Sequence, residues 1–393
     1  MKIKKVLVTD GESRKALCAV RTLGKHGYEV YVCSNQKINL SASSKYCFKS
    51  FLTPDPIIEK ERYLEQIQRV LKKYNIDVIL PMEDDTVELF ILNKQVLGNT
   101  KSLLPNHDSF MIARDKAKTI QHARVSNIPI PETHNINNGL ELQNEIPDDK
   151  FPLIIKPRMS SGSRGISIAK NKTELIEKYP TIHKEYSNPL VQQYLTGNFE
   201  KIQVLVLFDE KHELKLSCTY QGIREFPVDG GPVTLWKTVQ HDKIEDKTIR
   251  FLRNINWTGF AEVEYVFDPS HEQYYLMEIN PRFSANIALA VELGIDFPLY
   301  FAKISLNEEV ETTRNEQYEQ YAQWLLPGDI MNFIFNKERF KQEIGYLFKR
   351  PKNITYAILS KDDKAPINSF FKSLIFYFPS NAKKLIAKLK ITK

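Results

Sequence analysis

The chain has 393 residues, with 55 lysines and arginines against 48 aspartates and glutamates, and a formal net charge of +7. Hydrophobic residues make up 42% and charged residues 26%, values that exclude intrinsic disorder, collagen and coiled coil as the main architecture. At roughly 100–200 residues per domain, the length predicts two or three packed units.

No apolar run approaches the roughly 18 residues that span a bilayer, and the first residues do not resemble a secretory leader. The four cysteines lack the spacings of zinc sites and lie among apolar neighbours, which predicts buried, reduced thiols: Cys18, Cys33, Cys47 and Cys218. We therefore expect a cytoplasmic protein.

Strand and helix signals alternate over the first hundred residues. Three apolar strands and two helices with an apolar face follow one another: Lys5–Thr9, Arg14–His26, Tyr28–Cys33, Lys60–Lys73 and Asp77–Leu80. Repeated βαβ units predict a doubly wound parallel sheet with right-handed crossovers. The first turn, DGESR at residues 10–14, lacks the glycine pattern of dinucleotide-binding sheets, which argues against that type of cofactor.

The pattern changes from Ser109 onward. A helix over Ala113–Arg124 is followed by strands that are mostly adjacent along the chain and therefore suited to antiparallel pairing. These strands are Phe151–Lys156, Ile166–Ala169, Leu190–Tyr194, Gln203–Phe208, Lys215–Tyr220, Phe260–Phe267 and Tyr274–Ile279. With a closing helix at Ala285–Glu292, they predict an α+β unit of roughly two hundred residues.

Three oxygen-bearing side chains point to a metal site. Glu278 and Asn280 are two residues apart on one strand and so share a face, while Glu264 lies on the preceding strand of an expected hairpin. Carboxylate and amide oxygens suit Mg²⁺, which completes its coordination with substrate phosphates and water. A solvated strand face is the alternative, but Arg282 follows directly and places a cation beside a cluster suited to metal and phosphate.

A glycine-serine loop, SSGSRG at residues 160–165, follows the strand that ends at Lys156. Small residues let backbone N–H groups surround an anion, and the lysine adds a point charge. An ordinary flexible hairpin is the alternative reading of the loop. The segment QQYLTG at residues 192–197 ends a strand with a polar pair, which suits a backbone surface for a flat base.

Taken in chain order, these segments resemble the ATP-grasp superfamily. The resemblance rests on Asp115-Lys116, Lys156-Pro157 with its loop, QQYLTG, GFAEVEY and MEINPRF, and it covers residues 1 to about 310. The sequence is most similar in texture to the carboxylate–amine ligases and to single-unit relatives of the carbamoyl-phosphate synthase large subunit. The resemblance implies a pre-ATP-grasp domain at 1–108, an ATP-grasp domain at 109–310 with a small lid at about 120–192 and a catalytic part at about 193–310, and a C-terminal extension at 311–393.

The resemblance also implies site residues and cofactors. ATP would be bound by the two lysines, the loop, the hinge and a ribose-binding glutamate: Lys116, Lys156, Ser160, Ser161, Gly162, Ser163, Gly165, Gln192, Gln193, Tyr194, Leu195 and Glu200. Magnesium, as two ions or with Mn²⁺ in substitution, would be bound by Glu264, Glu278 and Asn280. Arg282 and Lys156 would be the catalytic residues.

The expected reaction activates a carboxylate as an acyl phosphate and joins it to an amine, with release of ADP and phosphate. Arg282 would stabilise the oxyanion and the leaving phosphate. Two alternatives stay open: a bicarbonate-activating enzyme of the same superfamily, and a non-catalytic ATP-binding scaffold. Small-molecule acids and amines are the expected partners, and a homodimer is a further expectation.

The substrate-covering loop is expected within residues 219–238. Arg224 could bind a substrate carboxylate there, with a salt bridge to a neighbouring glutamate as the equally weighted alternative. Lys237 in the same loop and Asn286 after the metal-binding strand are further substrate candidates.

The C-terminal part is aromatic and basic. Residues 367–378 have apolar side chains at helical spacing, and a second amphipathic helix is expected after Pro379. The pair of helices could dock on the protein itself or lie on an anionic membrane surface through residues 364–393. From Lys364 onward there are seven lysines and no acidic residue, so the rest of the chain is formally neutral and nucleic acid is not an expected partner.

Overall fold

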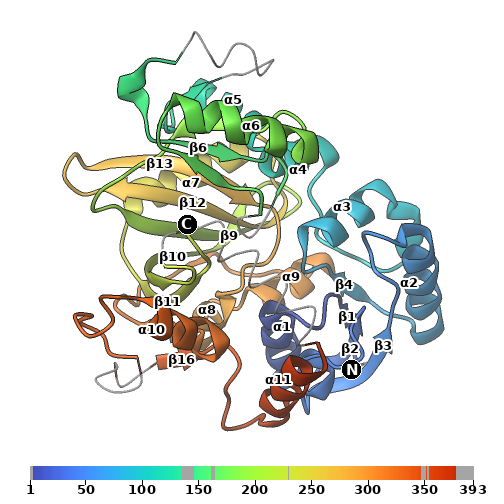
Figure 1. Cartoon of the computed structure of the whole chain (residues 1–393). Coiled ribbons are helices and arrows are strands. Elements are labelled where there is room, and N and C mark those ends of the chain that lie inside the picture. The colour runs from blue at the N-terminus through green and yellow to red at the C-terminus, as the bar shows by residue number, and fades with distance from the viewer. Residues whose placement is uncertain are drawn as a thin grey trace.

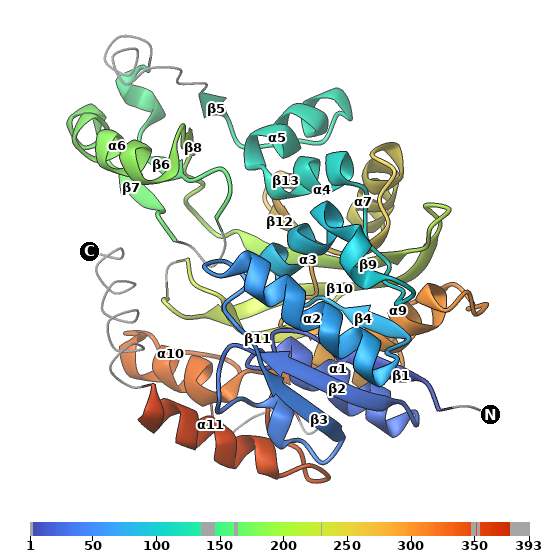
Figure 2. The same cartoon turned by 90° about the vertical axis from the view of Figure 1, so that its right-hand side faces the viewer.

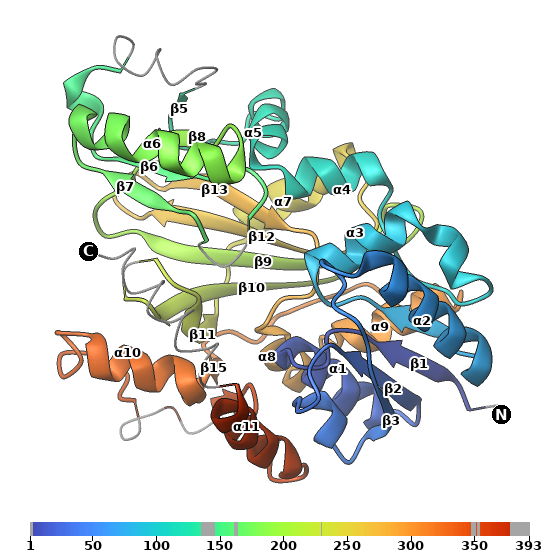
Figure 3. The ribbon, with the colours of Figure 1, turned by 45° about the vertical axis from the view of Figure 1, so that its right-hand side comes forward.

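The structure is a computed structural model that describes residues 3–134, 146–160, 164–228, 230–346, 351 and 354–377. Three sheets organise these residues (Figure 1). A parallel sheet forms the N-terminal part, a large mixed sheet forms the centre, and a small antiparallel sheet lies above the central one (Figure 3).

The N-terminal sheet has four parallel strands in the order β3-β2-β1-β4. Its strands are β1 (Lys5–Val8), β2 (Glu29–Ser34), β3 (Cys47–Leu52) and β4 (Val78–Leu80). Its helices are α1 (Arg14–Lys25), α2 (Lys60–Tyr74) and α3 (Asp84–Leu92). The predicted strands and helices are confirmed within one or two residues, while β3, which has few buried side chains, was not predicted.

Alternation along β1 gives this sheet two buried faces. Val6 and Val8 pack with α1 in one hydrophobic cluster, while Leu7 packs with α2 in another. The sheet is thus parallel and covered on both faces. The cluster around α1 continues into the central sheet and α9, so the N-terminal sheet and the central sheet share one core.

The predicted helix over Ala113–Arg124 is wrong in its extent. Two helices occupy this region, α4 (His107–Arg114) and α5 (Lys116–Val125), because Asp115 between them is extended and accepts a hydrogen bond from the N–H of Ala117 at 3.0 Å. Such an aspartate is an N-cap, which starts a new helix at Lys116. Arg158 donates to the same carboxylate at 2.9 Å and joins this point to the small sheet.

The small sheet has the order β5-β8-β6-β7 and carries one helix on its outer side (Figure 1). Its elements are β5 (Thr133–His134), β6 (Leu153–Lys156), β7 (Ser167–Ala169), α6 (Lys172–Tyr186) and β8 (Leu190–Gln193). This unit lies in the region expected to form the lid, at about 120–192, and its role as a lid stays a prediction; α6 was not predicted.

The central sheet runs β13-β12-β9-β10-β11-β15-β16, with β14 beside β10. Its long strands are β9 (Glu200–Phe208), β10 (Leu214–Glu225), β11 (Val233–Thr238), β12 (Gly259–Asp268) and β13 (Gln273–Asn280). Its short strands are β14 (Thr313–Arg314), β15 (Tyr321–Gln323) and β16 (Ile354–Tyr356), and α7 (Asp242–Asn254), α8 (Ile287–Glu292), α9 (Phe297–Ser305) and α10 (Ile330–Phe335) accompany it.

Residues after 310 therefore extend the central sheet, although we expected a separate extension to begin there. The strands concerned are only two or three residues long, too short to show an alternating pattern in the sequence.

The last described helix, α11 (Ala365–Phe376), docks on the N-terminal unit (Figure 2). Phe370 packs in one cluster with Leu17 and Leu40, and Asp363 just before the helix accepts from Arg21 Nε at 2.9 Å. Of the two alternatives for the predicted helix, docking on the protein is the one observed. The second expected helix lies outside the described residues, and among the described helices we find none that could span a bilayer.

Candidate functional site

An acidic surface forms where β12 and β13 pair. Glu264 lies directly opposite Glu278, and Glu262 lies opposite Asn280. Because side chains two residues apart share a face, the antiparallel register brings three carboxylates and one amide together. The amide nitrogen of Asn280 donates to Glu264 at 2.9 Å and to Glu262 at 3.2 Å. The predicted hairpin and its shared face are thus present.

These carboxylates repel one another in a buried place. Burial, together with the charges of Glu278 and Glu262, raises the pKa of Glu264 to about 8. Burial also opposes ionisation of Glu278, but Lys116, whose Nζ is 2.9 Å from its carboxylate, together with Lys156 and Arg282 outweighs that effect and lowers the pKa of Glu278. Like charges on opposing strands are destabilising on their own, so this arrangement favours a bound cation.

The donor set fits magnesium. Two carboxylates and one amide oxygen are hard ligands, and Mg²⁺ is ordinarily bound by one or two carboxylates together with phosphate oxygens and water. Within the described ranges there is no group of three or more His, Cys, Asp or Glu side chains arranged to hold a metal alone. The pair therefore suits an ion that arrives with a nucleotide.

Two lysines lie beside the acidic surface. Lys116 begins α5 and also donates to the carbonyl oxygen of Ser160 at 2.9 Å, which ties it to the start of the glycine-serine loop. Lys156 ends β6, is buried, and donates to Gln192 Oε1 at 3.1 Å. Burial lowers the pKa of Lys156 to about 8, so it is a desolvated cation whose hydrogen bond goes to an amide oxygen and not to a carboxylate.

The glycine-serine loop is described at its two ends. Ser161, Gly162 and Ser163 lie outside the described residues. Gly165 has φ +72°, and a Cβ there would come within 2.5 Å of Tyr186 and 2.7 Å of Pro157. Only glycine fits this position, which fixes how the loop returns to β7.

The hinge residues divide between two sides of β8. Gln192 is buried beside Lys156 and donates to Thr133 Oγ1 at 2.9 Å, whereas Gln193 and Tyr194 line a second cavity of about 290 Å³ with Phe151. Leu195 follows, half-buried. Glu200, the expected ribose ligand, begins β9 opposite Phe267, and within the described residues its carboxylate takes part in no side-chain hydrogen bond or ion pair.

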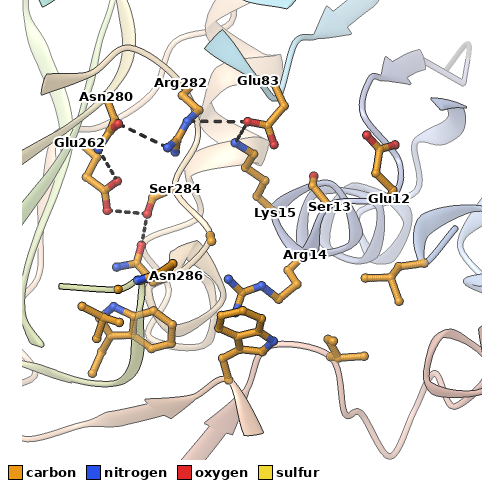
Figure 4. Close-up of a pocket in the computed structure, with 18 of the residues that line it drawn as sticks. Glu12, Ser13, Arg14, Lys15, Glu83, Glu262, Asn280, Arg282, Ser284 and Asn286 are labelled. Atoms are coloured by element: carbon orange, nitrogen blue, oxygen red, sulfur yellow. Dashed lines mark hydrogen bonds and ion pairs between the residues drawn. The ribbon is translucent and has the colours of Figure 1, made fainter. Parts of the chain in front are cut away.

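Arg282 lies between the acidic surface and the N-terminal unit (Figure 4). Its Nε is 3.4 Å from Asp84, its Nη2 donates to Asn280 Oδ1 at 3.3 Å, and the carboxylates of Glu83, Glu262 and Glu264 are also close enough to raise its pKa against the effect of burial. It is therefore a permanently charged guanidinium fixed at the end of β13.

A cavity of about 560 Å³ opens beside this arginine. Its walls come from the start of α1, from β11 to β13, from the turn after β13, and from α11 (Figure 4). The predicted residues Glu264, Glu278, Asn280, Arg282 and Asn286 all line it. The candidate magnesium ligands thus face a space large enough for further substrates.

A family model described as the carbamoyl-phosphate synthase L chain, ATP binding domain, matches residues 111–313, more than half of the chain. The chain belongs to this family. Such a domain is an ATP-grasp domain, so the resemblance noted from the motifs is confirmed, and with it the mixed α/β fold of this superfamily.

Solved ATP-grasp structures share this fold. The biotin carboxylase domain of 2-oxoglutarate carboxylase from Hydrogenobacter thermophilus, solved with MgADP and bicarbonate, is 16% identical, with a TM-score of 0.66 over 82% of this chain and 74% of that chain. N5-carboxyaminoimidazole synthetase from Staphylococcus aureus is 14% identical, with a TM-score of 0.65 over 90% of this chain and 92% of that chain. L-amino acid ligase from Bacillus licheniformis is 13% identical, with a TM-score of 0.62 over 79% of this chain and 76% of that chain.

Two substrate candidates do not face the cavity of this ATP-grasp chain. Arg224 is buried and binds Asp329 through Nε at 2.8 Å and Nη2 at 2.6 Å, so both of its outward donors are occupied. Arg224 therefore forms an ion pair, but its partner is the distant Asp329 and not the neighbouring glutamate of the expected alternative. Lys237 pairs with Glu319 at 2.8 Å. Its neighbour on β11, Trp236, lines the cavity, and because successive strand residues face opposite sides, Lys237 points away from the cavity.

Several residues of the ATP-grasp cavity were not predicted. Glu262 could have been found, because it shares the strand face of Glu264. Lys15, which pairs with Glu83 at 2.8 Å, and the indole of Trp324 come from distant segments, and no local pattern marks them. Ser284 donates to Glu262 at 2.5 Å, and Asn286 donates to Gln203 at 2.8 Å, which orders the turn after β13.

Proposed function

We propose that this ATP-grasp protein is a ligase that activates a carboxylate with ATP and joins it to an amine. The observation that carries the proposal is the acidic pair Glu264 and Glu278 between two lysines and an arginine, opening on a cavity of about 560 Å³. Family membership supports ATP as the nucleotide, and the MgADP-bound structural neighbour supports magnesium.

Lys116 and Lys156 would bind ATP phosphates, and the loop at 160–165 would close over them. Gln192, Gln193, Tyr194 and Leu195 would line the adenine, and Glu200 would bind the ribose, since no described residue occupies its carboxylate. Glu264, Glu278 and Asn280 would hold Mg²⁺ as two ions, with Mn²⁺ able to substitute. The bound ion would neutralise phosphate charge that otherwise repels the attacking carboxylate.

The reaction then has two steps. A carboxylate oxygen attacks the γ-phosphorus, the bond to ADP breaks, and an acyl phosphate forms. The amine attacks the acyl carbon, loses a proton, and expels phosphate. Arg282, charged and fixed by Asp84, would stabilise the oxyanion and the leaving phosphate. Enclosure of the cavity by α11 and the turn after β13 would protect the acyl phosphate from water.

Glu278→Gln tests the proposal. ADP release with a productive pair of substrates should fall by about two orders of magnitude, because a charged ligand of the reacting phosphates is lost. Glu272→Gln, an exposed glutamate in the β12–β13 turn, is the matched control and should keep the wild-type rate. A wild-type rate in Glu278→Gln would refute the proposal.

A coupled ADP-release screen over amino acids, peptides and sugar acids identifies the substrates. ADP release with bicarbonate alone would instead support the bicarbonate-activating alternative. Tight ATP binding without ADP release across the whole panel would support the non-catalytic scaffold.

Contact with an anionic membrane through residues 364–393 and homodimer formation stay predictions. Co-sedimentation with anionic liposomes, for the full chain and for a chain ending at Asp363, tests the first. Equal pelleting of both would reject it. Light scattering tests the second.

A further inference from the structure

Arg14 is the first residue of α1, and its side chain extends into the large cavity (Figure 4). The guanidinium carbon lies 3.5 Å from the centroid of the Trp324 ring, which is a cation–π contact. Its Nη1 is buried without a hydrogen-bond partner, and no carboxylate among the described residues pairs with it. Burial lowers the pKa of Arg14 to about 9, which still leaves it charged at neutral pH.

The other two cations of the wall are neutralised by the protein itself. Lys15 pairs with Glu83 at 2.8 Å, and Arg282 lies 3.4 Å from Asp84. Figure 4 shows the side chain of Lys15 directed toward Glu83 and that of Arg14 directed away from it. Removing an arginine from water without a counter-charge costs several kcal/mol. A bound anion would remove that cost, so Arg14 is suited to bind an anionic ligand.

The surroundings of Arg14 add donors and no matching acceptors. Trp236 and Trp324 both line this cavity, and their indole Nε1 atoms are buried without an acceptor among the described residues. An indole nitrogen can only donate a hydrogen bond, so three N–H donors from different segments lack acceptors around one cavity. The neighbouring wall contributed by Ile358, Phe370 and Leu374 is apolar.

We propose that Arg14 binds a carboxylate of the amine substrate, so that the acceptor of the ligase is an amino acid with a free carboxyl group. This inference rests on the proposed ligase function, in which Arg282 and the acidic pair serve the reacting carboxylate and leave the Arg14 end to the second substrate. A guanidinium matches a planar carboxylate through two parallel hydrogen bonds.

The charge of the cavity wall favours a monoanion. Lys15 and Arg282 already pair with Glu83 and Asp84, so among the described residues of this wall Arg14 is the cation left for a ligand anion, and a doubly charged phosphate would lack a second cation there. One carboxylate needs one cation, and Arg14 supplies it. Amino acids are also small enough for a cavity that the activated acid shares.

The test compares each productive amino acid with its carboxamide in wild type and in Arg14→Gln. Wild type should prefer the acid in kcat/KM by about 10- to 100-fold, the range for a hydrogen bond between charged groups. Arg14→Gln should raise KM for the acid by that factor, keep kcat within a few-fold, and abolish the preference. Arg14→Lys should restore part of it, and Arg253→Gln, an exposed arginine paired with Glu213, should behave as wild type.

Calorimetric titration separates this inference from the proposed function. With a non-hydrolysable ATP analogue and magnesium present, wild type should bind amino acids more tightly than their carboxamides, and Arg14→Gln should bind both equally. Selective binding without any ADP release would contradict the ligase and retain the carboxylate site. Turnover with equal use of acid and carboxamide, tighter binding of phosphorylated amines than of amino acids, or an unchanged preference in Arg14→Gln would overturn the inference.

Discussion

Replacing Lys156 with methionine should stabilise the protein without nucleotide while removing its affinity for ATP. Burial lowers the pKa of Lys156 from 10.5 to about 8, and at 1.36 kcal/mol per pKa unit this corresponds to about 3 kcal/mol against the folded state. Methionine fills a similar volume without charge. Gln192 Oε1 loses its donor at 3.1 Å, which costs about 1 kcal/mol. The net gain at pH 7 is therefore about 2 kcal/mol.

The pH dependence has a definite sign. Because the pKa of Lys156 is lower in the folded than in the unfolded state, the unfolded chain binds more protons between pH 8 and 10.5, and wild-type stability from this group rises over that window. The advantage of Lys156→Met should be complete below pH 8 and shrink as the pH approaches 10.5.

Urea unfolding and thermal melts, each with and without Mg-ATP, measure both effects. Without nucleotide the melting temperature of Lys156→Met should rise by a few degrees at pH 7. With saturating Mg-ATP wild type should gain stability by mass action, and the variant should gain little. Lys170→Met, at an exposed lysine, is the control and should change stability by no more than about 0.5 kcal/mol. A variant less stable than wild type at pH 7, or a difference that does not vary with pH, would refute the reasoning.

Three further variants test other contacts. Asp363→Asn should lower stability by about 2–4 kcal/mol in urea unfolding, because its buried carboxylate accepts from Arg21, Ser44 and the N–H of Lys45, whereas exposed Asp362→Asn should have little effect. Gly165→Ala should weaken ATP binding through the clash with Tyr186 and Pro157, while Gly27→Ala, at a positive φ in open space, should cost only about 1 kcal/mol of stability and leave ATP affinity unchanged. Arg224→Gln should lower the free energy of unfolding by about 3–5 kcal/mol, because it leaves the Asp329 carboxylate without its cation. The folded fraction should keep the wild-type KM values. A changed KM would instead support a role of Arg224 in substrate binding.

Local patterns predicted the parts of the site that lie on neighbouring strands. Glu278 and Asn280 share a face by alternation, and the hairpin places Glu264 beside them, so the acidic surface could be anticipated. Helix and strand periodicity likewise located most elements of the N-terminal sheet. The short strands after residue 310 and the helix break at Asp115 were not predicted, because neither produces a periodic pattern in the sequence.

Contacts between distant segments could not be anticipated. Asp329 is 105 residues from Arg224, and only the folded sheet shows that they pair. The same holds for Arg14 and Trp324, which no spacing rule connects. Nucleotide-binding residues follow family motifs, whereas the walls of the acceptor cavity depend on tertiary packing that one sequence does not display.

The docking of α11 sets an order in which the site is completed during synthesis. Residues 111–313, which match the ATP binding domain model, leave the ribosome before Trp324 and α11 do. Phe370 and Leu374 then close the cavity against Leu17 and Leu40, the last described helix meeting the first. A nascent chain can therefore fold its ATP-binding residues while the large cavity beside Arg282 is still open. Docking of α11 then closes that cavity.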